Sequence, residues 1–357
     1  MDEVKNVYYD GTKLLSMKDI NGNTPELYLC TTNRSGGKTT YFNRLLTRRF
    51  LRDGKKFCLV YRYNYELDDV ADKFFKDIKG LFFSEYFMVS KKRARGIFCE
   101  LFLTTDPNDP DSLKDCGYAV ALNSADQIKK YSHFFSDVDC MLFDEFQSET
   151  NHYCPDEVKK LISVHTSIAR GKGKQVRYVP VYMLSNQVSI INPYYTELGI
   201  CSRLNSKTNF LRGDGFVLES GFIETASKQQ KDSAFNRAFA SNEYVSYASE
   251  NVYLNDNMAF VEKPDSKSGK YLGTIRYNKS DFGIREYKDL GILYCDDRPD
   301  TSYPCKISVT TEDFQINYVM LKQYDIFVQQ MRYYFERGAF RFKDIRCKEA
   351  LMKMISY

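Results

Sequence analysis

The strongest chemical signal is the Gly-rich stretch TTNRSGGKTT at residues 31–40. It lies between a hydrophobic run and a helix-like run, the setting in which backbone N–H groups and a helix N-terminus bind phosphate. Lys38 is placed to reach the β and γ phosphates, and the Thr39 hydroxyl is placed to bind Mg²⁺. Thr32 replaces the first glycine of G-x-x-x-x-G-K-[ST]. The stretch predicts a deviant Walker A loop, although Gly-Lys-Thr also occurs in ordinary strand-to-helix turns.

A second motif is CMLFDEF at residues 140–146, where an apolar strand ends in Asp144 and Glu145. In an ATPase, Asp144 would hold Mg²⁺ and Glu145 would polarise the attacking water. The alternative is a solvated strand end. Because both motifs occur in the right order along the chain, the pair favours an ATPase that hydrolyses ATP.

Two weaker candidates complete this site. The strand RYVPVYMLSN ends at Asn186, which would sense the γ-phosphate or simply form a turn. Arg170 follows the helix-like run EVKKLISVHTSIAR and opens a basic region with six net positive charges up to Arg212. Arg170 is therefore our candidate arginine finger for a neighbouring subunit.

Composition excludes several classes of protein. The chain has 357 residues and a formal net charge of +4, too small by itself to indicate a nucleic-acid partner. No run approaches the roughly 18 apolar residues that span a bilayer, and the start lacks a signal-peptide pattern, so we expect an intracellular protein. The ten cysteines form no C-x-x-C pair, and we expect them to be buried structural thiols without zinc.

The elements that must position these residues follow an α/β rhythm. Residues 26–215 alternate strands with helices, typical of a parallel sheet: ELYLCTT, the helix TTYFNRLLTRRFLRD, KKFCLVYRY, and further strands up to RYVPVYMLSN. Residues 216 to about 250 are polar and helix-prone, as in a lid or linker. A second, α+β domain follows, with strands at NMAFVEK, KYLGTIRYNK, FGIREYKD and GILYCDD and a long helix from Thr311 to Gly338.

TTNRSGGKTT, MLFDEF, LSNQVSIINPYY and YFERGAFRFKDIRCKEALMKM together resemble the DNA-packaging (encapsidation) ATPases of the phi29-like small podoviruses, over nearly the whole chain. The resemblance implies an ASCE-type P-loop ATPase domain with a parallel-rich sheet at 1–212, a lid at 213–250 and a smaller RNase H-like domain at 251–357. It also implies an ATP- and Mg²⁺-dependent translocase that packages double-stranded DNA into a procapsid.

The partners implied are double-stranded DNA, the portal, four further copies in a five-subunit ring and, in some relatives, a packaging RNA. Such a protein works in the host cytoplasm, transiently attached to the portal, without a membrane.

By position, the resemblance assigns catalytic roles to Arg34, Glu145 and Arg170, and metal contacts to Thr39 and Asp144; Asn186 is the further catalytic candidate suggested by its place at the strand end. The implied nucleotide-binding residues are Thr32, Asn33, Arg34, Ser35, Gly36, Gly37, Lys38 and Thr39.

Three departures from the family pattern matter. Thr32 and Ser35 replace glycines of the loop, and Asn64 stands where the family tends to place a pore lysine. Expected DNA contacts therefore shift to two basic runs, each of which equally fits a solvated surface. One run is predicted to form a compact basic turn with Lys91, Lys92 and Arg93, and the other contains Lys129 and Lys130.

The second domain offers no set of converging acids for a two-metal nuclease, so we predict no nuclease activity. Two other functions remain open from the residues. One is a helicase-like nucleic-acid ATPase with the same core, and the other is a non-catalytic scaffold with a degenerate P-loop.

Overall fold

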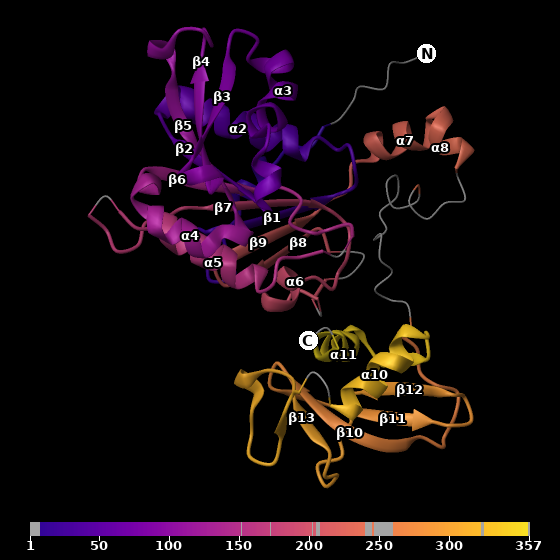
Figure 1. Ribbon diagram of the computed structural model, residues 1–357. Coiled ribbons are helices and arrows are strands. Elements are labelled where there is room, and N and C mark those ends of the chain that lie inside the picture. Colours follow the sequence, from indigo (N-terminus) through magenta and orange to yellow (C-terminus); the bar gives the residue numbers. More distant parts are fainter. Residues whose placement is uncertain are drawn as a thin grey trace. The chain divides into compact units, whose positions relative to one another are not determined.

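The computed structural model divides the chain into two compact units (Figure 1), made of residues 1–197 with 205–255 and of residues 198–204 with 256–357. The residues it describes are 8–150, 152–171, 173–201, 203–204, 208–239, 245, 260–322 and 325–355.

A nine-stranded sheet forms the first unit, in the order β3-β4-β5-β2-β6-β7-β1-β9-β8. The six strands from β5 to β9 in that order are parallel, and β3, β4 and β8 are antiparallel additions at the two sides. Parallel strands are buried on both faces, which explains their continuous apolar sequences. The strands are β1 (Leu27–Thr32), β2 (Lys56–Tyr61), β3 (Phe87–Arg93), β4 (Phe98–Thr104), β5 (Lys114–Ala121), β6 (Val138–Phe143), β7 (Val181–Asn186), β8 (Phe210–Gly213) and β9 (Phe216–Ser220).

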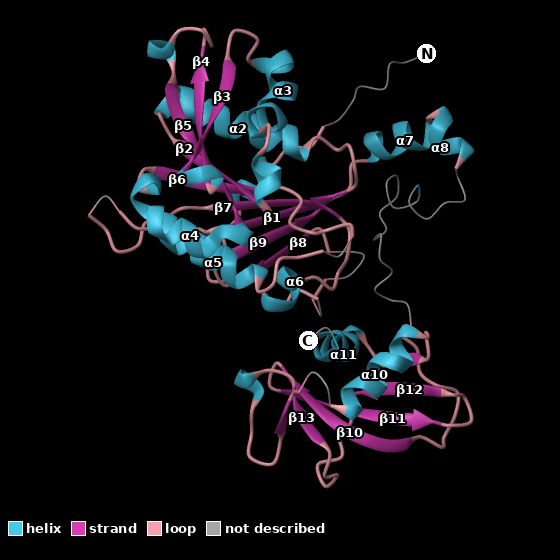
Figure 2. Cartoon of the chain, viewed as in Figure 1, coloured by secondary structure: helices cyan, strands magenta, loops and turns pink. Residues whose placement is uncertain are grey.

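Helices cover this sheet (Figure 2). Phe42 and Leu46 of α2 and Phe74 of α3 join one buried cluster with sheet residues such as Leu59 and Leu142. Among the described residues of this unit, the helices are α1 (Thr12–Ser16), α2 (Lys38–Asp53), α3 (Val70–Phe82), α4 (Ala125–Ile128), α5 (Glu157–Ile168), α6 (Pro193–Glu197), α7 (Glu224–Asp232) and α8 (Ala234–Ala238). The predicted α/β class with a parallel-rich sheet is confirmed.

The second unit has a six-stranded sheet in the order β14-β13-β10-β11-β12-β15. Strand β11 is antiparallel to its two neighbours, β10 and β12. On one side β13 and β14 run parallel to β10, and on the other side β15 runs parallel to β12. This order agrees with the expected α+β, RNase H-like domain. Its elements are β10 (Lys270–Tyr277), β11 (Ser280–Tyr287), β12 (Ile292–Asp296), β13 (Lys306–Ser308), β14 (Val319–Met320), α10 (Ile326–Glu336), β15 (Phe340–Phe342) and α11 (Ile345–Ile355).

The long helix expected from Thr311 to Gly338 is wrong in its first half. A single 3₁₀ turn spans Thr311–Asp313, β14 follows, and α10 begins only at Ile326. The side chain of Asp325 caps α10 by accepting a hydrogen bond from the Phe327 N–H. Helical spacing alone was misleading because Phe314 and Val319 are exposed, so the apolar residues of this stretch do not form the buried face of a helix.

Two other expected segments, the lid and the first strand of the second domain, differ from the observed elements at their ends. The range expected as a lid, 213–250, includes β9, which lies between β1 and β8 in the first sheet because Phe216, Val217 and Leu218 are buried there. Of the strand expected at NMAFVEK, residues 257–259 lie outside the described residues, and the described residues 260–263 form no strand but contain Val261, which makes an isolated bridge to Phe342.

All ten cysteines are free thiols, nine of them buried. In the described part of the chain, no helix is long and apolar enough to cross a membrane.

Candidate nucleotide-binding site

The loop between β1 and α2 has the backbone shape of a phosphate-binding turn. Gly37 precedes the helix at φ +91°, a conformation that strongly favours glycine. Gly36 is also constrained, because a Cβ atom there would lie 2.9 Å from Cγ1 of Ile223. The first turn of α2 therefore faces the loop with its backbone N–H groups available to an anion.

Lys38 lies at the start of α2 and reaches the end of another parallel strand. Its Nζ donates a hydrogen bond to Oδ1 of Asn186, at 2.7 Å. Burial lowers the pKa of Lys38 below its usual value, while the nearby Asp144 carboxylate acts in the opposite direction. The structure thus joins the predicted phosphate-binding lysine and the predicted sensor in one contact.

The acidic pair lies directly beside this lysine. The Thr39 hydroxyl donates to Oδ2 of Asp144 at 2.7 Å, and the backbone N–H of Glu145 donates to Oδ1 of the same carboxylate at 2.9 Å. A hydroxyl and a carboxylate are the oxygen ligands Mg²⁺ prefers, and this ion is commonly held by one or two carboxylates together with substrate phosphates. The residues present therefore fit Mg²⁺, with Thr39 and Asp144 as its protein ligands.

Glu145 is held in an unusual position. Its φ is +55°, which turns the chain sharply after β6. Burial, followed by the nearby carboxylates of Asp144 and Glu149, raises the pKa of Glu145, while Arg34 partly offsets this effect. A carboxylate with a raised pKa is a stronger base, as the activation of a water molecule requires.

Arg34 joins the same site through a residue that the sequence motifs do not indicate. Its guanidinium lies 3.4 Å from Oε1 of Glu149, which also accepts a hydrogen bond from Nδ2 of Asn186 at 3.5 Å. Glu149 lies four residues after Glu145 in the loop following β6. It thus links the P-loop arginine to the predicted sensor.

The segment that starts with α7 is attached to the P-loop. Asn33 and Ile223 exchange two hydrogen bonds, from the Ile223 N–H to Oδ1 at 2.8 Å and from Nδ2 to the Ile223 carbonyl at 3.1 Å. Nε2 of Gln230 donates to the Ser35 hydroxyl at 2.8 Å. Ser35 has φ +60°, so this hydrogen bond accompanies the serine that replaces a family glycine. No motif indicates a role for Gln230, which lies 195 positions away from Ser35.

A buried ion pair lies beneath the acidic motif. The Arg62 guanidinium makes two hydrogen bonds to the Glu157 carboxylate, at 2.7 and 3.0 Å, and one to the Phe146 carbonyl at 2.9 Å. It also approaches the Glu145 carbonyl at 3.4 Å. Glu157 accepts a further hydrogen bond from the Tyr194 hydroxyl at 2.7 Å. Arg62 thus fixes the backbone that carries Glu145. The sequence motifs indicated neither Arg62 nor Glu157 as part of this support.

Arg170 lies away from this site in its own chain. Helix α5 starts at Glu157, beside Arg62, and its 12 residues extend it by about 18 Å. At its far end, Arg177 donates to the carbonyls of Ile168 and Val138, the latter being the first residue of β6. The exposed Arg170 therefore lies near the opposite edge of the sheet from Lys38.

The candidate DNA-binding residues lie in two places. Lys91, Lys92 and Arg93 belong to the edge strand β3, not to a turn, and each has a partner within the chain. The contacts are Lys91 over the Phe102 ring, Lys92 with Asp68 at 2.6 Å and Arg93 with Glu100 at 2.7 Å.

Lys129 pairs with Asp126 at 3.3 Å, whereas the neighbouring Lys130 is exposed and forms no ion pair with a described residue. None of these five residues approaches the P-loop through a described contact.

Comparison with known proteins decides the family. The sequence model of the podovirus DNA encapsidation protein (Gp16) family matches residues 1–356. The chain belongs to this family.

Members of the family and their structures agree over nearly the full length. The DNA packaging protein of Bacillus phage phi29 is 27% identical over 322 residues, covering 90% of this chain and 88% of the relative. That of Bacillus phage B103 is 26% identical over 328 residues, covering 91% and 93%.

The solved bacteriophage phi29 genome packaging motor assembly contains a chain with a TM-score of 0.64 at 23% identity, covering 98% of this chain and 100% of that one. The fold of the whole chain is therefore that of a phage packaging protein.

Proposed function

We propose that this protein is the ATPase subunit of a motor that drives double-stranded DNA into a viral procapsid. The observation that carries the proposal is the meeting of Lys38, Thr39, Asp144, Glu145 and Asn186 at the carboxyl ends of three parallel strands. Ligands of open α/β sheets bind at this edge. Its relatives are DNA packaging proteins, and we therefore propose that hydrolysis drives DNA packaging.

In this proposal, Lys38 leaves Asn186 to contact the β and γ phosphates, and Glu145 orients the attacking water and accepts its proton. A bound Mg²⁺ supplies charge neutralisation of the phosphate oxygens. Asn186, released by Lys38, can then contact the γ-phosphate. Glu149, which accepts a hydrogen bond from Asn186, also pairs with Arg34. The nucleotide pocket comprises the loop residues 32–39.

Hydrolysis must also produce movement. Loss of the γ-phosphate changes the contacts of the loop, and Asn33 and Ser35 transmit the change to the segment that includes α7. In this proposal the segment that includes α7 acts as a lid, placed along the chain between an ATPase domain and an RNase H-like domain.

Arg170 acts on the site of a neighbouring subunit, because it lies near the wrong edge of the sheet to reach its own. This requires a ring, which we propose to be a pentamer on the portal.

For DNA contact we propose the basic runs at 91–93 and 129–130. Lys130 is the first choice because it breaks no described ion pair when it binds a phosphate. A motor that moves any sequence must grip the backbone, so the contact should weaken steeply with salt.

The test is ATP turnover with and without duplex DNA, combined with a strand-separation assay. We expect duplex DNA to stimulate turnover without unwinding. Unwinding would indicate a helicase instead, and absence of turnover under both conditions would indicate a scaffold.

A further inference from the structure

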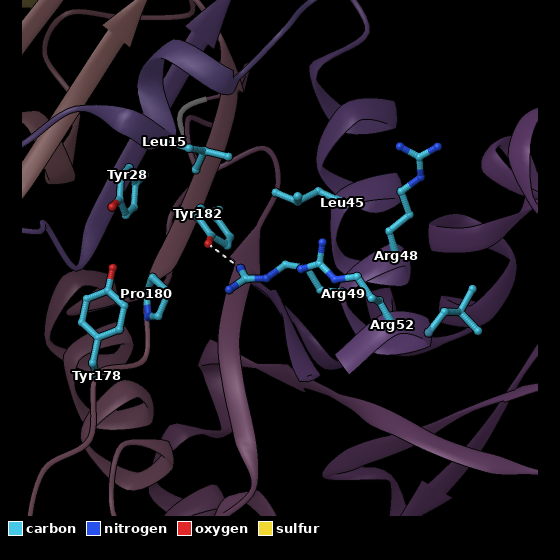
Figure 3. Close-up of a pocket in the computed structure, with 10 residues that line it drawn as sticks. Leu15, Tyr28, Leu45, Arg48, Arg49, Arg52, Tyr178, Pro180 and Tyr182 are labelled. Carbon is cyan, nitrogen blue, oxygen red and sulfur yellow. Dashed lines mark hydrogen bonds between the residues drawn. The ribbon is translucent and has the colours of Figure 1, made fainter. Parts of the chain in front are cut away.

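A cavity of about 780 Å³ lies in the first unit, away from the nucleotide site. The last turns of α2 form one wall, and residues at the beginnings of β1 and β7 form the other (Figure 3). Because α2 starts at Lys38 and runs for 16 residues, about 24 Å, the P-loop and this cavity lie at opposite ends of the same helix. The phosphate-binding chemistry described above therefore does not account for it.

Three arginines from one helix line the cavity. Arg49 is fixed in the wall by its hydrogen bond to the Tyr182 hydroxyl, at 2.9 Å. Arg48 and Arg52 are exposed and lie four residues apart, one helical turn or about 6 Å along the axis. Arg48 forms no ion pair or hydrogen bond with a described residue.

Arg52 pairs with its neighbour Asp53 at 2.7 Å, and its side chain is 77% exposed. Exposed ion pairs contribute little, so an incoming anion can replace this one. Arg48 and Arg52 thus offer two guanidinium groups to anions that repeat along one strand.

The opposite wall is aromatic. Tyr28 and Tyr182 are buried, whereas Tyr178 is 52% exposed. The hydroxyl of Tyr178 is anchored by a hydrogen bond to the Pro25 carbonyl at 2.8 Å, which leaves the ring at the edge of the cavity. Figure 3 shows Tyr28 and Tyr178 across from the arginines of α2. A fixed, half-exposed ring next to guanidinium groups is the combination that stacks a base and holds its phosphates.

From this arrangement we infer that the cavity binds an unpaired nucleic-acid strand. Phosphates contact Arg48 and Arg52, and one base stacks on Tyr178. The volume suits a nucleotide unit, since sites for small ligands measure about 300–1,000 Å³. A duplex would present phosphates to the arginines but keep its bases away from Tyr178. RNA and single-stranded DNA share the required chemistry, and the experiment separates them.

The experiment measures binding of labelled oligouridylate, oligothymidylate and a duplex to the full chain by fluorescence anisotropy over a range of salt concentrations. The double variant Arg48→Ala/Arg52→Ala should bind single strands at least about tenfold more weakly. Its slope of log K against log salt should be shallower by about 1.4, the effect of losing two phosphate contacts to a single strand. Tyr178→Leu should weaken binding by roughly tenfold, whereas Tyr178→Phe, which keeps the ring, should bind nearly normally.

The matched control is Lys76→Ala/Lys159→Ala, which removes two exposed charges from other helices and should leave the slope for single strands unchanged. A larger loss for one oligonucleotide identifies RNA or DNA as the ligand. An unchanged affinity and slope for both single strands would overturn the inference, as would a loss confined to the duplex. Loss of ring assembly with normal oligonucleotide binding would assign the cavity to a subunit contact and overturn it as well.

This result is separable from the proposed function. Basal ATP turnover of the Arg48→Ala/Arg52→Ala variant should match that of the unaltered protein. If the unaltered protein does not hydrolyse ATP, the motor proposal fails, while the oligonucleotide measurements still decide the fate of the cavity.

Discussion

Both units of this protein place carboxylates at the ends of central strands, but they surround them differently. In the first unit, Asp144 and Glu145 form no ion pair with a described residue, and Asp144 is approached by a hydroxyl and a backbone N–H. In the second unit, Asp296 pairs with Arg285 at 2.9 Å, and Asp281 pairs with Arg276 at 3.0 Å. Asp297 is likewise bound to Lys343.

Asp144 and Glu145 of the first unit therefore have no ion-pair partner within the described residues, whereas the three acids of the second unit are already paired with arginine or lysine. A carboxylate with a guanidinium partner has its charge satisfied inside the fold, and it gains little by binding a metal ion. Within the described residues, no group of three or more His, Cys, Asp or Glu side chains is placed to hold a metal ion. The first unit can still hold one because its substrate brings phosphate oxygens, whereas the second unit would need to supply the acids itself.

The largest expected effect concerns Arg170, the positive charge that a neighbouring subunit would add to the nucleotide site of the first unit. Arg170→Ala should lower DNA-stimulated turnover by about 10³-fold or more, since an arginine finger stabilises charge in the transition state. Lys38→Ala subunits should be inactive for a different reason, the loss of the phosphate contact. Mixing the two variants should restore part of the turnover, because some interfaces combine an intact Lys38 site with an intact Arg170.

The control for this mixing experiment is Lys174→Ala, an exposed basic residue in the same loop, which should retain turnover by itself. No recovery at any mixing ratio would show that Arg170 does not act between subunits.

Glu145→Gln tests whether the free carboxylate of the first unit performs catalysis. Removing a general base should lower turnover by about 10²–10⁴-fold, while the neutral amide keeps the shape of the side chain and nucleotide binding is retained. Turnover and nucleotide affinity are measured on the same preparation. If the variant hydrolyses ATP normally, the assignment of the base is wrong, and if neither protein hydrolyses ATP, the chain is a scaffold.

The buried Arg62–Glu157 pair belongs to the first unit but resembles the satisfied acids of the second. Arg62→Ala leaves a carboxylate buried without its cation, which should destabilise the protein by about 3–5 kcal/mol. Replacing both residues by methionine should recover part of this loss. Urea denaturation, followed through the unfolding transition of the first unit, measures the free energy of unfolding of both variants.

Lys159→Ala is the contrasting variant, since its exposed pair with Asp156 should contribute less than about 1 kcal/mol. An equal loss of stability in both variants would mean that burial of the Arg62 pair has no special cost.

The sequence predicted the first unit more accurately than the second. The P-loop and the acidic motif could be located from the sequence because each is a contiguous string with a chemical requirement at fixed spacing, and the alternation of apolar strands with helices predicted the parallel sheet. Glu149, Arg62 and Gln230 could not be assigned, because their roles depend on partners brought near only by folding.

In the second unit, the helix predicted from Thr311 failed because periodicity does not reveal where a short strand such as β14 joins a sheet edge. The boundary after residue 212 was placed too early for a similar reason, since β9 pairs with β1, a strand nearly two hundred residues earlier in the sequence.

A smaller effect is expected where the P-loop meets α7. Gln230→Ala removes one exposed neutral hydrogen bond to Ser35, worth about 0.5–1.5 kcal/mol, so nucleotide affinity should change by no more than about tenfold. Ser35→Gly removes the same bond and also relieves the positive φ. If the bond matters for affinity, the double variant should resemble Ser35→Gly alone. Additive effects in nucleotide titrations would show that the two residues act independently.

The smallest expected effect lies in the second unit and tests the comparison itself. Asp296→Asn should leave ATP turnover within about twofold of the original value, because this carboxylate is already engaged by Arg285 and belongs to a different compact unit. The unaltered protein should also fail to nick supercoiled plasmid with Mn²⁺, since a two-metal centre needs several acids converging on ions about 4 Å apart. Nicking that disappears in an Asp296→Ala variant would show that an acid with a guanidinium partner can still serve a metal centre. The presence of an ion pair would then no longer distinguish a structural carboxylate from a catalytic one in this protein.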